Sequence, residues 1–182
     1  YLHLKYMKYF LLLAFAVSIY SCKTKTANVP LAIADEDSLQ SFFPVTDYLK
    51  GQVEIIKNSP LNPLMIKTAS GKSDSTYVKI ESLDSLFSPF MQPLIDTINL
   101  MDTYKQSRFY DKTIDQYTLS YEAKDKSKLV EGLLNWDVYV SPKNNMVNRV
   151  YVIKELPDKN QLQLTWQSDK QCKIIEVSNK TE

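Results

Sequence analysis

Few side chains in this sequence could support catalysis or hold a cofactor. The chain has 182 residues and a single histidine, His3, close to its beginning. Beyond that position, Ser-His-Asp catalysis, Cys-His catalysis and histidine metal sites are excluded. The three glycines, Gly51, Gly71 and Gly132, are too far apart to form a glycine-rich phosphate loop. The sequence therefore predicts no catalytic residue, no metal site and no cofactor, and a protein that is not an enzyme.

Carboxylates and one cysteine are the remaining candidates for chemistry. Two carboxylates could hydrolyse a glycoside, but the spacing of the available aspartates singles out no pair. Cys172 has Lys170 and Lys173 nearby but no histidine base to form a thiolate. We therefore expect Cys172 to be a half-buried structural thiol. The aspartates are Asp84, Asp96, Asp102, Asp111, Asp115 and Asp137.

A recognition surface is the alternative to catalysis. Tyr139, Arg149 and Tyr151 fall on the polar side of two predicted strands. Tyrosine and arginine are favoured at the centres of binding interfaces, so these three residues form a possible binding face. The other interpretation is an ordinary solvated sheet face on which tyrosine and arginine pack across strands.

Alternating apolar and polar residues predict the strands that would carry this face. The pattern begins with Tyr117, Leu119 and Tyr121, and turn-forming residues separate its segments. We expect a five-stranded antiparallel meander whose apolar face packs on helices. The pattern over 98–111 is ambiguous, a loop and then a short strand around Arg108 to Tyr110. The later expected strands are 134–140, 150–153, 162–167 and 174–177.

Helical spacing dominates the part of the chain before the meander. An acidic stretch at 35–38 suggests a helix start, and apolar residues recur at helical spacing over 45–58 after Pro44. A second apolar stripe covers 83–95, where we expect a break near Ser88 and a new helix at Pro89. A predicted β-hairpin over 64–81 lies between the two helical segments. The predicted fold class is α+β: two N-terminal helical segments flanking a hairpin, then the five-stranded meander, as one domain over 35–178 with a tail at 179–182.

The first 21 residues have the form of an export signal. Lys5 and Lys8 precede an apolar run of about ten residues, half of what a membrane-spanning helix needs. The run ends in Ile19-Tyr20-Ser21-Cys22, which resembles the lipobox of bacterial lipoproteins. Ile19 and Ser21 match that motif, while Tyr20 departs from its usually small middle position. A buried N-terminal helix is the alternative, and residues 1–6 precede a plausible start at Met7.

This resemblance implies a membrane anchor. Cleavage between Ser21 and Cys22 would leave Cys22 as the lipidated first residue, followed by a flexible tether over 22–34. Lys23, in place of an aspartate, implies transfer to the outer membrane, and no acidic run follows that would suggest export to the surface. The body of the chain also looks like uncharacterised bacterial lipoproteins, on the segments 42–45 and 136–140, and that resemblance implies no activity.

The charge balance narrows the choice of partners. The chain has 22 basic and 21 acidic residues, and removal of Lys5 and Lys8 leaves 20 basic residues. This near-neutral balance gives no reason to expect nucleic-acid binding. We therefore expect a non-catalytic, lipid-anchored envelope protein with a binding or assembly role in the periplasm and an envelope protein as its partner. The first alternative is a carrier of a hydrophobic ligand or lipid between helices and sheet, and the second is a carboxylate-based hydrolase.

Overall fold

A computed structural model describes residues 41–96 and 98–178 of the chain. The predicted signal peptide, Ser21, Cys22, the tether, the helix start at 35–38 and the tail at 179–182 lie outside the described residues. Within these residues, no helix has the length and apolar character that crossing a membrane requires.

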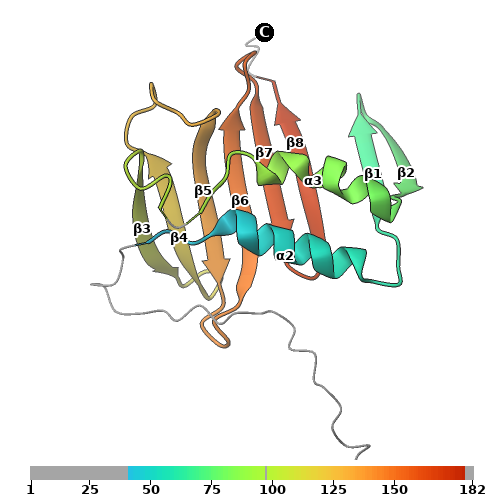
Figure 1. Ribbon diagram of the computed structural model, residues 1–182, viewed down its shortest axis with the longest axis horizontal. Coiled ribbons are helices and arrows are strands. Elements are labelled where there is room, and N and C mark those ends of the chain that lie inside the picture. The colour runs from blue at the N-terminus through green and yellow to red at the C-terminus, as the bar shows by residue number, and fades with distance from the viewer. Residues whose placement is uncertain (1–40, 97, 179–182) are drawn as a thin grey trace, which may run out of the picture.

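The larger of two sheets contains six antiparallel strands in chain order (Figure 1). Strands that follow one another in sequence pair with each other, as expected for strands joined by short turns. The strands are β3 (Tyr104–Asp111), β4 (Gln116–Ala123), β5 (Leu133–Val140), β6 (Val147–Glu155), β7 (Gln161–Gln167) and β8 (Gln171–Val177).

The predicted α+β class with a five-stranded meander is wrong. The fold is mostly β, with a six-stranded sheet, a separate two-stranded sheet and two short helices. The sixth strand is β3, where the sequence predicted a loop and only a short strand around Arg108 to Tyr110. It pairs along its whole length with β4, from Tyr104 opposite Ala123 to Asp111 opposite Gln116. β3 is an edge strand with a mixed surface, so its sequence lacks a clear alternation. Hydrogen bonding to β4 stabilises the extended conformation of this segment. The strand propensities of its own residues do not reveal such pairing.

The smaller sheet is a hairpin of β1 (Leu64–Ala69) and β2 (Lys72–Tyr77). Ser70 and Gly71 join the strands, and both have positive φ, 50° and 74°. Two such residues form the turn whose twist matches that of paired antiparallel strands. The turn therefore consists of Ser70 and Gly71, between the paired residues Ala69 and Lys72.

Two helices, α2 (Val45–Lys57) and α3 (Leu83–Met91), lie across one face of the larger sheet (Figure 1). The break expected near Ser88 is absent, and Pro89 lies inside α3. Proline at this position leaves the carbonyl of Ser85 without its helical donor. The Ser88 hydroxyl donates a hydrogen bond to that carbonyl over 2.9 Å, which helps the helix continue past the proline.

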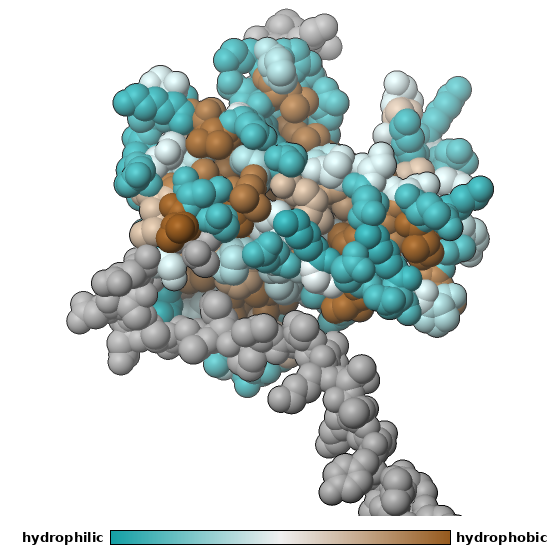
Figure 2. Space-filling model, in the orientation of Figure 1, coloured by the Kyte–Doolittle hydropathy of each residue, from teal (hydrophilic) through white to brown (hydrophobic). Residues whose placement is uncertain are grey.

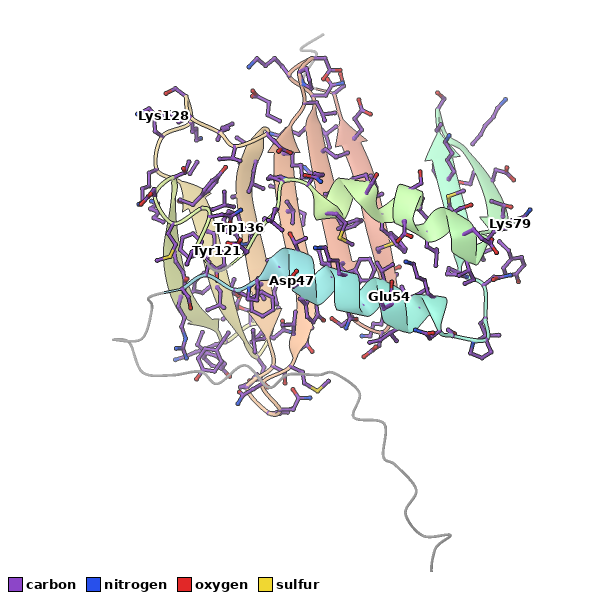
Figure 3. The ribbon with its side chains drawn as sticks, in the orientation of Figure 1. Asp47, Glu54, Lys79, Tyr121, Lys128 and Trp136 are labelled. Atoms are coloured by element: carbon purple, nitrogen blue, oxygen red, sulfur yellow. The ribbon has the colours of Figure 1, made fainter. Side chains whose placement is uncertain are left out.

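Aromatic side chains fill the space between the helices and the sheet. Tyr121 and Trp136, labelled in Figure 3, are fully buried and stack with ring centroids 4.6 Å apart. Phe42 packs edge-on against both rings. A second cluster joins α3 to β7, where Phe87 and Trp166 have centroids 5.1 Å apart. These contacts pack the helices on one face of the sheet, and the opposite face carries no helix (Figure 1).

Candidate functional site

The face of the larger sheet opposite the helices carries the residues that the sequence singled out. Alternate residues of a strand point to opposite faces, so burial of Trp136, Val138 and Val140 places Tyr139 on the helix-free face. The same alternation places Arg149 and Tyr151 there, because Val150 and Val152 are buried. We call this surface the open face.

Strand register brings the three predicted residues together with two others. Tyr139 lies directly opposite Arg149, and Tyr151 lies opposite Asp137. Asp137 in turn lies opposite Ser120 on β4, and the Ser120 hydroxyl donates a hydrogen bond of 2.6 Å to its carboxylate. The guanidinium carbon of Arg149 lies 3.9 Å from the centre of the Tyr139 ring. This is a cation–π contact between half-buried side chains, so the two residues hold each other in place.

A β-bulge borders the cluster. The pairing of β5 with β6 shifts between Tyr139 and Val140, so that Tyr139 faces Arg149 but Val140 faces Val147. Bulges bend a strand and redirect its side chains, and they are over-represented next to functional sites. Here the bulge lies next to the turn that joins β5 to β6. Arg149, near the start of β6, therefore lies close to that turn.

The cluster places one half-buried negative charge near one positive charge. Burial raises the pKa of the Asp137 carboxyl, and nearby Glu122 raises it further, whereas the Ser120 hydrogen bond and Arg149 lower it. Burial also raises the pKa of the Tyr139 hydroxyl, so that hydroxyl stays protonated at neutral pH. The open face thus presents an aromatic ring, a delocalised cation and hydroxyl donors around a half-buried carboxylate. These groups suit the recognition of polar and peptide groups.

A buried hydroxyl lies beside this cluster. Thr118 lies opposite Tyr139 on β4 and is 2 % exposed. Among the described residues, its hydroxyl oxygen has no hydrogen-bond partner. An unbonded buried polar atom is unusual.

Four of the five other candidate aspartates have structural partners of their own. Asp84 on α3 forms an ion pair with Lys57 over 2.7 Å. The backbone N–H groups of Asn99 and Ile98 lower the pKa of Asp96. Asp111 accepts a hydrogen bond from the Thr113 backbone, Asp115 accepts one from the Tyr110 hydroxyl, and Asp102 is exposed. Within the described residues, no three of the Cys, Asp and Glu side chains are arranged to hold a metal ion.

Cys172 on β8 is a half-buried free thiol. Burial raises its pKa, which disfavours the reactive thiolate. The expected half-burial of this thiol is confirmed, and its structural role stays a prediction.

Lys154 is a buried cation that the sequence reasoning missed. It lies on β6, is 7 % exposed and donates hydrogen bonds to the carbonyl oxygens of Pro89 and Gln92 at the end of α3. Burial lowers its pKa to about 8, and Glu131 offsets part of this effect. Helix C-terminal carbonyls stabilise a cation, so Lys154 attaches α3 to the sheet. Its signal was present in the sequence, because it continues the inward-facing series of Val150 and Val152.

No protein family model matches the chain, and no curated protein or solved structure is significantly similar to it.

Proposed function

We propose that this protein is a lipid-anchored envelope lipoprotein that binds a partner protein through the open face. The anchor is Cys22, and the chain faces the periplasm from the outer membrane. Support for the anchor comes from the apolar run before Cys22, with Ile19 and Ser21 at the positions of a lipobox. The role is binding or assembly and involves no catalysis.

The observation that carries the binding proposal is the pre-arranged cluster of Tyr139, Arg149, Tyr151 and Asp137. Cation–π packing holds Tyr139 against Arg149, and the Ser120 hydrogen bond holds Asp137, before any partner arrives. Pre-arranged side chains lose little conformational freedom on binding, which favours affinity. The helices leave this face uncovered (Figure 1), so a partner could reach it without moving any described element.

The carrier and hydrolase alternatives gain no comparable support. A carrier would need a cavity between the helices and the sheet, and the aromatic rings of Phe42, Tyr121 and Trp136 occupy that region. A hydrolase would need two cooperating carboxylates. Glu122, the carboxylate near Asp137, is exposed and forms an ion pair with Lys105 over 3.3 Å.

The proposal is tested in cells by fractionation and site-specific crosslinking. The wild-type chain should incorporate labelled palmitate and sediment with membranes, and Cys22→Ala should abolish the label and release the protein, because the thioether lipid is lost. A photo-crosslinking amino acid at Tyr151 should capture a partner, whereas the same amino acid at Ile55, exposed on α2, should not.

Two outcomes would contradict this function. An unlabelled wild-type protein that sediments with membranes as strongly as Cys22→Ala would exclude the lipid anchor. Equal capture from Tyr151 and Ile55, or capture from Ile55 alone, would exclude the open face as the binding surface. An Arg149→Ala variant serves as a further check, since it should reduce capture from Tyr151 at least fivefold while leaving palmitate labelling intact.

A further inference from the structure

A groove separates the two sheets on the side of the molecule away from β3. Residues of β1 line one wall and residues of β8 line the other, and the groove has a volume of about 880 Å³. β1 pairs with β2, and β8 belongs to the larger sheet, so no hydrogen-bonded ladder joins the two walls. Figure 2 shows the surface hollowed between the β1–β2 hairpin and the strands of the larger sheet.

Both walls present unpaired backbone groups to the groove. β8 is the last strand of its sheet, so alternate residues of Gln171–Val177 direct their N–H and C=O groups away from β7. On β1, the turn makes Ala69 and Lys72 a hydrogen-bonded pair. By alternation, Ile66 and Thr68 belong to non-hydrogen-bonded pairs, and their backbone groups point away from β2. An unpaired strand edge is a template for another strand.

Apolar side chains of both walls are exposed. Ile66 on β1 is 67 % exposed, and Ile174 and Ile175 on β8 are 40 % and 47 % exposed. An edge strand with β-branched side chains at the surface gives an added strand apolar contacts as well as hydrogen bonds. Globular proteins commonly protect such edges with charged residues or a covering segment.

The charged side chains that line the groove indicate which kind of segment would bind there. Lys67 and Lys173 line it on opposite walls, and within the described ranges neither lysine forms an ion pair. Glu176 also lines the groove, but its carboxylate accepts a hydrogen bond from the Asn160 amide over 3.0 Å. Two lysines and one carboxylate leave the groove with an excess of one positive charge, which favours an occupant with acidic side chains.

We propose that this groove binds an extended acidic segment of a partner protein as an added β-strand between β1 and β8. Figure 1 shows β1 and β8 running in the same direction, so one strand lies antiparallel to both walls at once. Antiparallel pairing is the more stable arrangement. The added strand joins the two sheets into one. The inference is independent of the open face and of the lipid anchor, and it stands or falls by separate measurements.

The test uses the full chain in mild detergent and three synthetic eight-residue peptides. The probe alternates valine and glutamate, the second peptide alternates valine and lysine, and the third is the probe with a central proline. The probe should bind at least tenfold more tightly than the lysine peptide at low salt, because it complements Lys67 and Lys173. The proline peptide should bind at least tenfold more weakly than the probe, because proline removes a ladder donor.

Two readouts place the probe in the groove. Bound probe should slow hydrogen exchange at the backbone amides of Ile66 and Thr68. It should also slow alkylation of Cys172, which lines the groove, as measured on the proteolytic fragment that contains this residue. The matched variant carries Lys67→Glu and Lys173→Glu, both at exposed positions. This variant should reverse the preference, so that the lysine peptide binds more tightly than the probe.

Three results would overturn the inference. Absence of probe binding at millimolar concentration would exclude an added acidic strand. Equal binding of all three peptides would mean that neither charge nor backbone pairing governs the site. Concentration-dependent dimerisation of the chain that protects Ile66 and Cys172 without any peptide would assign the groove to a second copy.

Discussion

The protonation of Asp137 is set by side chains on two neighbouring strands. Burial raises the pKa of this carboxyl, and Ser120, Glu122 and Arg149 shift it in both directions. Ser120 donates a hydrogen bond to the charged form, and Arg149 attracts it, while Glu122 repels it. The charge of Asp137 therefore depends on individual neighbours that shift its pKa in opposite directions. Replacing one neighbour at a time measures the contribution of each.

Ser120→Ala should raise the pKa of Asp137, because the charged carboxylate loses a hydrogen bond. Glu122→Gln should lower the same pKa, because it removes a nearby negative charge. Carboxyl carbon chemical shifts, followed by NMR as a function of pH, measure both changes at this one residue. Shifts of the same sign in the two variants would show that the open-face cluster does not control the titration of Asp137.

Among the elements, the junction of β5 and β6 sets the strictest backbone requirement. Gly132 precedes β5 with φ of 73°, and a Cβ atom there would lie 2.1 Å from the carbonyl oxygen of Glu155. The Glu155 N–H donates a hydrogen bond of 2.7 Å to the Gly132 carbonyl. The pairing of the two strands therefore requires glycine at this position. Any residue with a Cβ atom would displace backbone atoms.

Gly132→Ala should lower the free energy of unfolding by about 2 kcal/mol or more, since positive φ and a backbone collision both act against it. Gly51→Ala is the matched control, because Gly51 lies exposed in α2 with no atom within 4 Å of an added Cβ. That control should raise the free energy of unfolding by up to about 1 kcal/mol, the helix-propensity difference between the two residues. Urea denaturation measures both values, and equal effects would refute this description of the junction.

At the scale of the whole molecule, the helices are attached to the sheet by aromatic packing and by one buried cation. Phe87 and Phe90 of α3 pack against Trp166, and Lys154 reaches the end of the same helix from β6. The aromatic contacts do not depend on pH, whereas the lysine does. The docking of α3 should therefore contribute a pH-dependent part to the stability of the protein.

Stability should rise with pH above about 8 because of Lys154. Its pKa is about 8 in the folded protein, against 10.5 ordinarily, so the unfolded chain binds more protons between these values. The full difference between the unfolded and folded pKa of Lys154 corresponds to about 3 kcal/mol in the free energy of unfolding. Tyr121, whose pKa burial raises from 10.0 to about 12, acts in the opposite direction above pH 10. Cys172, whose pKa burial raises from 9.0, acts in the same opposing direction above pH 9, so the rise is measured between pH 8 and 9.

Lys154→Met should remove this rise, because methionine fills a similar volume without a titrating group. Thermal unfolding of both proteins at a series of pH values provides the measurement, and the difference between the two curves isolates Lys154. Parallel curves for wild type and variant would show that the folded and unfolded states hold the Lys154 proton equally well.

The sequence by itself determined the elements whose signal is local. The alternation over 117–121, 134–140, 150–153, 162–167 and 174–177 predicted antiparallel strands. It also placed Tyr139, Arg149 and Tyr151 on one face, because alternate residues of a strand share a face. The same rule could have identified Lys154 as an inward-facing residue.

The tertiary structure decided everything that depends on which segments meet. β3 is a strand because it pairs with β4, although its own residues lack a clear period. Asp137 lies between Ser120 and Tyr151 because of the register of three strands, and Lys154 reaches α3 because of how that helix docks. The groove between β1 and β8 involves two strands about 100 residues apart. Local periodicity reports which face a side chain takes, whereas pairing and docking arise from contacts between distant parts of the chain.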